Sequence, residues 1–430
     1  MLNITENVAK ILGVNINIKG FEVSSKKVQK NYVFFALKGK KVDGHDFLKE
    51  AKMNGATVAV VSKDYKGENF GLILVFVDDV FLTLKSLGKM CAENKKNIIG
   101  ITGSVGKTST KEFLAQILAK KYKIGKTKES YNGQIGLPVS ILNMQGNEDL
   151  WILEMGISEP NEMDQLLDVV TLDVAVITKI IMCHVANFKG GMKDIIEEKL
   201  KILRDVKKAI VHMDLQKEVK NFKKEIVYYS MNDSRADFFL KVEDNYGVIF
   251  EKGKKIIKLP INIREKHFWE NILAAIATAR FFGFSYEEIK TENLLLPKMR
   301  CEKIEKKDVI FINDTYNANP TSMKAALDDL ATYKQKKIAV LGPMKELGQF
   351  AKQEHTKVLK HALSVADQIL VVGDEYKVDE NFQKKEKVFF FENLETLTKE
   401  LEKILTPNSV VLLKGSRSVG VEKIFELLNF

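Results

Sequence analysis

Short apolar runs divide the first part of the chain into alternating predicted strands and helices. YVFFAL (32–37), TVAVVS (57–62) and LILVFV (72–77) are rich in β-branched and aromatic residues, which favours buried strands. HDFLKEAKMNGA (45–56) lies between the first two and has the pattern of a helix that ends at a glycine. We therefore expect residues 1–93 to form a small α/β domain.

A second domain is expected over residues 94–296. NIIGIT (97–102) predicts a buried strand that is followed by a glycine-rich turn and a helix. WENILAAIATARFFG (269–283) predicts an apolar helix, and the short alternating segments of residues 208–262 suggest antiparallel strands. The other predicted elements of this domain are the strands WILEMG (151–156) and VAVITKI (174–180) and the helix IIEEKLKILRDV (195–206).

Strands and helices alternate again over residues 297–430, after the proline-containing segment LLLPKMR (294–300), which is a candidate hinge. This rhythm is typical of an open parallel sheet flanked by helices, as in Rossmann-like domains. The chain is therefore assigned to the α/β class, with three domains and mostly parallel sheets in the last two. The predicted strands of the last domain are VIFIND (309–314), IAVLGP (338–343), QILVVG (368–373), VFFF (388–391) and VVLLKG (410–415). Three helices are predicted there: one that begins at Ser322, one that ends at about Ser364 and one near 393–404.

The composition is that of a soluble globular protein, with 45% apolar and 29% charged residues in 430. The three cysteines, Cys91, Cys183 and Cys301, are too far apart for a zinc motif or a disulfide framework, which favours a reducing compartment. The start of the chain lacks the pattern of a signal peptide, and no apolar run is long enough to span a membrane. We expect a soluble, cytoplasmic protein.

The net charge of +10 raises the question of a nucleic-acid partner. Only six of the 67 basic residues are arginines, and the lysines are scattered along the chain. The favoured interpretation is a lysine-rich solvated surface, with attraction of small polyanionic substrates as an alternative. No nucleic-acid partner is expected.

A glycine-rich stretch between a predicted strand and a predicted helix matches a phosphate-binding loop, although Ile101 stands where the strict pattern has glycine or alanine. Glycines let successive backbone N–H groups point at an anion, and the helix N-terminus adds partial positive charge. Lys107 would reach the β- and γ-phosphates of a nucleotide, and Thr108 would offer its hydroxyl to Mg²⁺. The predicted loop consists of Gly103, Ser104, Val105, Gly106, Lys107, Thr108 and Ser109.

Glu154 and His184 follow two further predicted strands, where an α/β protein binds its metal. The alternatives are an inert exposed carboxylate and a structural histidine. On spacing alone, Lys199 belongs to the solvated face of a helix. Asn271, four residues after His267, could contact a nucleobase edge or simply cap its helix.

Polar residues cluster after two strands of the last domain. The stretch from Asp314 to Pro320 has the composition of a turn, but polar side chains at the carboxyl end of a strand also suit ligand binding. The stretch from Lys414 to Ser418 offers amides, hydroxyls and a guanidinium, which suit an anion.

These motifs occur in the order found in the Mur ligases, the ATP-dependent amide-forming enzymes that build the peptide of the bacterial cell wall, and the chain resembles this family over nearly its whole length. The resemblance implies a UDP-sugar-binding first domain, a central ATPase domain and a last domain that binds the incoming dipeptide. DTYNANPTSM, LGPMKELG and KGSRS are most similar to the member that adds D-alanyl-D-alanine to UDP-N-acetylmuramoyl-tripeptide. The motifs are TGSVGKTSTKE, YNGQIGLP, ILEMG, the strand before His184, EKLKI, HFWEN, DTYNANPTSM and KGSRS.

The resemblance also implies roles for individual residues. ATP would be bound by the phosphate loop, with Asn271 at the adenine and Arg300 and Asp314 reaching the nucleotide from the third domain. Two Mg²⁺ ions would be held by Thr108, Glu154, His184 and Lys199, the last as a carbamylated lysine, and the catalytic residues would be Lys107, Lys199 and His184. Substrate contacts are expected from Ser25, Lys38, Gly39, Asn132, Tyr316, Asn317, Asn319, Lys414, Ser416 and Arg417.

The sequence departs from the family pattern at several of these places. Such departures bear on the sugar and peptide contacts and on the loop around His184, and they leave the phosphate, magnesium and adenine residues intact. They are Ser24-Ser25-Lys26 for Asp-Ser-Arg, Gly133 for the second Asn of a pair, Ile181-Met182-Cys183 for Gly-Pro-Ala, Ala186 for Glu and Pro343 for Asp.

Several alternatives remain. The same class of enzyme includes a sibling ligase that adds the third peptide residue and a folylpolyglutamate synthase-like ligase, and DTYNANPTSM argues against both. A GTPase switch would need Asn-Lys-x-Asp, but the segment from Asn94 to Asn97 lacks the aspartate. A binding module without activity is disfavoured by the complete set of catalytic residue types. The sequence favours a monomer without fixing the oligomeric state, and it does not identify the base that deprotonates the amine.

Overall fold

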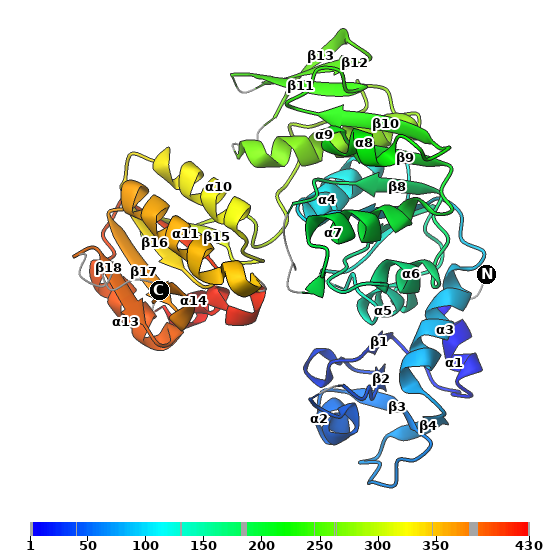
Figure 1. Cartoon of the computed structure of the whole chain (residues 1–430). Helices are drawn as coiled ribbons and strands as arrows, with labels where there is room; N and C mark the ends of the chain where they lie inside the picture. The colour runs from blue at the N-terminus through cyan, green and yellow to red at the C-terminus, as the bar shows by residue number, and fades with distance from the viewer. Residues whose placement is uncertain are drawn as a thin grey trace. The chain divides into compact units, whose positions relative to one another are not determined.

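The chain forms two compact units (Figure 1). The first comprises residues 1–180, 196–260 and 270–291, and the second comprises residues 181–195, 261–269 and 292–430. The structure, a computed structural model, describes residues 3–428 apart from Lys40, Ser130, 182–186, Asn245, Asn262, Arg264, Glu346 and 378–385.

A four-stranded parallel sheet in the order β1-β2-β3-β4 opens the first unit. Its core packs α2 (Leu48–Met53) on the buried side chains of the sheet. Two helices that the apolar pattern did not indicate flank this domain, α1 (Ile4–Ile11) and α3 (Val80–Ala92). The strands are β1 (Gly20–Glu22), β2 (Tyr32–Phe35), β3 (Ala56–Ser62) and β4 (Ile73–Val77).

The first unit also holds a nine-stranded sheet in the order β13-β12-β11-β10-β9-β8-β5-β7-β6. In this sheet order, each strand from β11 through β5 to β6 is parallel to its neighbours in that range. The pairs β11–β12 and β12–β13 are antiparallel. The expectation of antiparallel strands over residues 208–262 is therefore wrong for β9 and β10 and correct for the last two pairs. The bounds are β5 (Ile98–Thr102), β6 (Ile124–Lys126), β7 (Leu150–Glu154), β8 (Val174–Ile177), β9 (Lys208–His212), β10 (Glu225–Ser230), β11 (Phe238–Glu243), β12 (Tyr246–Glu251) and β13 (Lys254–Pro260).

Helices connect the parallel strands of this sheet. α3 packs on α5, and the lack of a side chain at Gly88 permits this approach, because a Cβ there would lie 3.0 Å from Pro138. The first domain is thus packed directly on the central one. The helices are α4 (Lys107–Leu118), α5 (Gly136–Leu142), α6 (Glu162–Leu167), α7 (Met192–Leu200), α8 (Gln216–Val219) and α9 (Trp269–Phe281).

The second unit contains a six-stranded sheet in the order β14-β15-β19-β16-β17-β18, parallel except for β14 (Figure 1). The α/β assignment with a Rossmann-like last domain is confirmed. The strands are β14 (Glu302–Lys306), β15 (Val309–Asp314), β16 (Lys336–Leu341), β17 (Gln368–Val372), β18 (Val388–Phe391) and β19 (Ser409–Lys414), and the helices are α10 (Pro320–Ala331), α11 (Ala351–Val365), α13 (Leu394–Ile404) and α14 (Ile424–Leu427).

The two faces of this sheet carry different helices. α13 and α14 bury their apolar residues in one core cluster with alternate residues of the strands, whereas α10 and α11 pack on each other outside that cluster. The chain therefore leaves β19 toward one face and leaves β15 and β16 toward the other. Neighbouring strands whose loops diverge in this way create a crevice at their carboxyl ends, which is where open α/β sheets bind ligands.

Residues 294–300 form neither helix nor strand. A hinge in this segment stays a prediction, as do the domain boundaries after residues 93 and 296. Among the described residues, no helix is both long and apolar enough to cross a membrane.

Candidate functional site

The predicted phosphate loop lies between β5 and α4, and both of its glycines are required by their surroundings. Gly103 has a φ of +149°, and a Cβ at this position would lie 1.9 Å from the hydroxyl of Thr178. Gly106 has a φ of +87°, and a Cβ there would lie 2.2 Å from Oδ1 of Asn271. The structure therefore places Asn271 directly against the loop, and its contact with adenine stays a prediction.

The end of β8 fixes one side of the loop. The Thr178 hydroxyl donates to the Val105 carbonyl at 2.7 Å, and the amides of Ser104 and Val105 donate to the Lys179 carbonyl at 3.0 and 3.3 Å. These two amides are therefore engaged within the protein. This differs from the expectation that successive amides of the loop point at an anion. The start of α4 offers amides that an anion could bind, since the first turn of a helix has N–H groups without intrahelical acceptors.

The side chain of Lys107 curls over the loop from the first turn of α4. Its ammonium donates to the Gly103 carbonyl at 2.8 Å and to the Ser104 carbonyl at 3.2 Å. A phosphate bound at the helix N-terminus would therefore meet this cation without a large rearrangement of the backbone.

Glu154 ends β7 directly beside the loop, because it pairs in register with Ile101 of β5. Its side chain is 1% exposed. Oε1 accepts from Nδ2 of Asn132 at 2.7 Å, while Oε2 has no hydrogen-bond partner among the described residues. A buried carboxylate oxygen is normally paired, so this oxygen is a ready ligand for a cation.

Lys111 approaches the free oxygen of Glu154, and sequence reasoning missed it. Its side chain is completely buried, its ammonium donates to the Thr127 carbonyl at 2.8 Å, and it lies 3.6 Å from Oε2 of Glu154. The available signal was its position on α4, one turn after Lys107 and one turn before Ala115. That position places a charged residue on the buried face of the helix.

Other predicted metal ligands have surroundings that suit this role. Thr108 is 6% exposed, and the hydroxyl of the adjacent Ser109 has no hydrogen-bond partner among the described residues. Lys199 lies near the end of α7 with its side chain 1% exposed, so the solvated-face alternative is wrong. His184 lies outside the described residues. Among the residues that the structure describes, no three His, Cys, Asp or Glu side chains gather as a metal site, but Thr108 and Lys199 are of other types.

Glu22 and Tyr131 join the first domain to the loop that carries Asn132. The carboxylate of Glu22 accepts from the Tyr131 hydroxyl at 2.9 Å and from the amides of Val23 and Ser24 at 2.8 and 3.1 Å. Burial and the Glu22 charge raise the pKa of Tyr131, so this phenol remains a donor. A shift of β1 would thus be transmitted to the residue next to Asn132.

The predicted sugar-contact residues of the first domain have different surroundings. Ser25 is 7% exposed, its hydroxyl donates to Glu50, and its carbonyl accepts from Asn54 at 2.9 Å. Lys38 and Gly39 lie on an exposed turn. The structure therefore does not bring Ser25 to the surface, although it leaves Lys38 and Gly39 accessible.

In the second unit, Asp314 and Lys414 form a buried ion pair at the carboxyl ends of β15 and β19. Nζ of Lys414 lies 2.5 Å from Oδ2 of Asp314 and 3.1 Å from the Asn317 carbonyl. The Arg300 guanidinium stacks over the Tyr316 ring, 4.1 Å from its centroid. The predicted residues Arg300, Asp314, Tyr316, Asn317 and Lys414 thus lie at one end of this sheet.

Two of the predicted substrate residues here also shape the backbone. Asn319 caps α10, where its side chain accepts from the amide of Ser322 at 2.9 Å, and Oδ1 of Asn317 accepts from the amide of Ala318 at 2.9 Å. The turn interpretation accounts for both side-chain oxygens. Arg417 remains half exposed and pairs with Glu422 at 3.3 Å.

His267 does not share a regular helix with Asn271. It lies in the 3₁₀ turn Lys266–Phe268 before α9, and burial lowers its pKa. Of these two residues, only Asn271 lies on α9.

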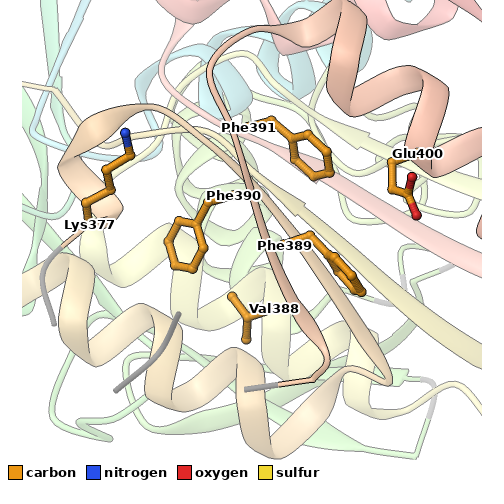
Figure 2. Close-up of a pocket in the computed structure, with 6 residues that line it drawn as sticks. All are labelled: Lys377, Val388, Phe389, Phe390, Phe391 and Glu400. Atoms are coloured by element: carbon orange, nitrogen blue, oxygen red, sulfur yellow. The ribbon is translucent and has the colours of Figure 1, made fainter. Parts of the chain in front are cut away.

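A cavity of about 530 Å³ lies on the edge strand β18, away from these residues (Figure 2). In Figure 2 the side chain of Phe390 points to one side of the strand, and those of Phe389 and Phe391 point to the other. None of the lining residues is a predicted site residue. They are Lys377, Val388, Phe389, Phe390, Phe391 and Glu400.

Comparison with known sequence families gives three matches in chain order. The Mur ligase family catalytic domain matches residues 17–122, the Mur ligase middle domain matches residues 101–279, and the Mur ligase glutamate ligase domain matches residues 299–417. Together they cover all three sheets.

Individual relatives align over nearly the whole chain. A UDP-N-acetylmuramoyl-tripeptide–D-alanyl-D-alanine ligase of Borreliella burgdorferi is 30% identical over 453 residues, with 98% of this chain and 96% of that protein covered. The crystal structure of MurF ligase from Thermotoga maritima in complex with ADP has a TM-score of 0.77 at 29% identity, covering 95% of this chain and 96% of that one. A crystal structure of MurF from Acinetobacter baumannii has a TM-score of 0.82 at 26% identity, with 98% of each chain covered.

A phosphate loop beside a buried strand-end carboxylate, followed by a separate Rossmann-like domain, defines an ATP-dependent ligase of the three-domain type. The chain belongs to the Mur ligase family.

Proposed function

We propose that the chain is the ligase that uses ATP to join D-alanyl-D-alanine to UDP-N-acetylmuramoyl-tripeptide. It would act as a soluble monomer in the cytoplasmic phase of peptidoglycan precursor synthesis, and thereby in cell-wall formation, cell shape and division. The products would be the UDP-linked pentapeptide, ADP and phosphate.

The observation that carries this proposal is Oε2 of Glu154 beside the phosphate loop, which accepts no hydrogen bond from any described residue. Asn132 donates to Oε1, the other oxygen of this carboxylate, and the Lys107 side chain lies over the phosphate loop. This geometry suits a nucleotide phosphate with a divalent cation. The full-length relatives, named as the D-alanyl-D-alanine-adding ligase, support the choice of substrates.

Magnesium fits the residues that are present. Glu154 offers an oxygen that makes no hydrogen bond to a described residue, Thr108 offers a buried hydroxyl at the start of α4, and His184 would complete the proposed set. Lys199 would serve as an anion after carbamylation, for which a buried, neutral amine is the required precursor. Mg²⁺ bound by these residues would neutralise charge on the transferring phosphoryl group.

The proposed reaction has two steps. The terminal carboxylate of the tripeptide attacks the γ-phosphate of ATP, which gives an acyl phosphate and ADP. The neutral amine of D-alanyl-D-alanine then attacks the acyl carbon, the C–O bond to phosphate breaks, and the amine loses a proton as the amide forms. Lys107 and the amides at the start of α4 offset the repulsion between the two anions of the first step.

The second unit would receive the dipeptide at the carboxyl ends of β15, β19 and β16. Ser416 and Arg417 follow β19 there and can meet the carboxylate of a zwitterionic dipeptide, and Lys414 would reach it only by giving up its buried pairing with Asp314. By the resemblance to the Mur ligases, Arg300 and Asp314 of this unit would contact the nucleotide.

Sibling ligases are less well supported. A UDP-N-acetylmuramoyl-L-alanyl-D-glutamate–2,6-diaminopimelate ligase structure has a TM-score of 0.52 at 15% identity, which is a likeness of fold alone. The motifs DTYNANPTSM and KGSRS remain the sequence features that favour the dipeptide.

A coupled ADP-release assay with UDP-N-acetylmuramoyl-tripeptide tests the proposal. ADP should be released continuously with D-alanyl-D-alanine and not with L-lysine, diaminopimelate or L-glutamate. Continuous release with one of these amino acids, and none with the dipeptide, would refute the substrate assignment.

A further inference from the structure

We propose that His355 and Tyr376 are positioning residues for the incoming dipeptide, because together they hold the loop Gly342–Lys345 at the wall of its crevice. This inference rests on the proposed function of the second unit. Neither residue is required to touch the substrate.

The loop lies where the sheet topology creates the crevice. It follows β16, whose chain continues to α11 on one face, and it adjoins Gly415 after β19, whose chain continues to α14 on the other. The backbones nearly touch, since a Cβ at Gly342 would lie 3.2 Å from Cα of Gly415. Such a switch point is the usual ligand position of an open α/β sheet.

His355 holds the loop through its backbone. Nε2 of His355 accepts from the amide of Met344 at 2.9 Å, and Nδ1 donates to the Ala351 carbonyl at 2.7 Å. The ring is completely buried. Accepting at one nitrogen and donating at the other requires the neutral ring, and burial lowers the pKa of His355 in agreement.

Tyr376 fixes the start of the same loop. Its hydroxyl donates to the Gly342 carbonyl at 3.3 Å, and its ring meets that of His355 edge to face with centroids 4.6 Å apart. Because both rings are buried, neither hydrogen bond can be replaced readily by water.

Ser416 holds the loop from the side of β19. Its hydroxyl accepts from the amide of Lys345 at 2.9 Å, and its own amide donates to the Pro343 carbonyl at 3.0 Å. The loop is thus clamped between α11 and the residue after Gly415. Loss of the His355 clamp would let the loop drift relative to Ser416, and a small misplacement at a substrate wall has a large kinetic effect.

The test compares the kinetics of four variants with those of the wild type. His355→Phe keeps a ring against Tyr376 but removes the acceptor for Met344, and Tyr376→Phe removes only one hydroxyl. His355→Gln restores an amide oxygen as acceptor. His361→Phe is the matched control, because His361 lies on the same helix but is partly exposed and pairs with Asp328 at 2.8 Å.

The expected result is a rise of about threefold to tenfold in KM for D-alanyl-D-alanine in His355→Phe, with a smaller rise in Tyr376→Phe. KM for ATP and for UDP-N-acetylmuramoyl-tripeptide should stay unchanged, His355→Gln should recover most of the loss, and His361→Phe should match the wild type. Thermal unfolding identifies any variant that fails to fold. If His355→Phe fails to fold, the result for Tyr376→Phe decides the test.

An unchanged KM for the dipeptide in folded His355→Phe or, failing that variant, in Tyr376→Phe would overturn the inference. An equal rise in all three KM values would also overturn it, because that pattern indicates a general structural role. If the wild type shows no dipeptide-dependent ADP release, the proposed function itself has failed, which is a separate outcome.

Discussion

The ammonium of Lys111 lies 3.6 Å from Oε2 of Glu154, and both side chains are almost completely buried. The lysine comes from the helix after the phosphate loop, and the glutamate comes from the end of the neighbouring strand. The ion pair brings a cation to the Glu154 carboxylate next to the loop, while Oε2 accepts no hydrogen bond from the residues that the structure describes. A buried carboxylate of this kind would be strongly destabilising without a nearby cation.

We predict that Lys111→Met lowers the free energy of unfolding by about 3–5 kcal/mol, because it leaves the Glu154 carboxylate buried without its cation. Adding Glu154→Gln should recover part of this loss, since it removes the buried charge of Glu154, whereas Glu112, which also lies 3.4 Å from the Lys111 ammonium, keeps Lys126 as a second cation. Urea denaturation of the single and double variants measures both values. Lys126→Met is the control, because Lys126 is 41% exposed and pairs with Glu112 at the surface. A double variant that is no more stable than Lys111→Met would contradict the charge argument.

Lys107→Ala should lower kcat by about 10²–10³-fold, because a preorganised cation is removed from the transferring phosphoryl group. The fold should survive, since the Lys107 ammonium bonds to the loop carbonyls of Gly103 and Ser104 and contributes nothing to the apolar core. Steady-state kinetics and circular dichroism check the two statements. A Lys107→Ala variant whose kcat lies within about tenfold of the wild-type kcat would contradict the phosphate-loop assignment.

Lys199→Ala should be almost inactive if the buried lysine acts as a carbamate. Short carboxylic acids added to this variant should restore part of the rate, because they can supply the missing anion in the space that the side chain occupied. The readout is the ADP-release rate at increasing acetate or propionate concentration. The wild type and Lys201→Ala are the controls, since Lys201 is one-third exposed and pairs with Asp164 at 2.7 Å. Equal stimulation of Lys199→Ala and the controls would argue against carbamylation.

Stability should fall as the pH drops below the ordinary histidine pKa of about 6.5, because burial lowers the pKa of His355 in the folded state. In this window the unfolded chain binds a proton that the folded protein excludes, so acid favours unfolding down to the lowered pKa. Burial is the largest influence on the pKa of His355; Lys345 also lowers it, whereas the hydrogen bond to the Ala351 carbonyl and the charges of Glu375 and Glu354 raise it.

Denaturation midpoints between about pH 7 and about pH 5 measure this effect. His355→Gln should flatten the slope, whereas His361→Gln, changed at a partly exposed position, should leave most of it. His267, whose pKa burial also lowers, contributes to the slope that remains. A slope unchanged by His355→Gln would show that this ring does not titrate as proposed.

Strands that are buried on both faces were predictable from the sequence. NIIGIT contains β5, and VVLLKG overlaps β19, because both faces of such strands select apolar residues over a continuous run. The three-residue strand β6 was missed because it is too short to show a pattern, and α5 because it opens with glycine and contains proline. The antiparallel interpretation failed at β9 and β10, since alternation identifies a strand and not the direction of its partner.

The sequence by itself determined the phosphate loop, Glu154 at a strand end and the order of the three domains, because each depends on residues that are close in the chain. Only the tertiary structure decided that Lys111 lies beside Glu154, that Tyr131 bonds to Glu22 and that His355 holds the loop at Met344. These contacts join residues of different helices, strands and loops. Local propensity and periodicity carry no information about which buried polar groups will meet, since that choice is made by how the elements pack and by the cost of leaving such groups unpaired.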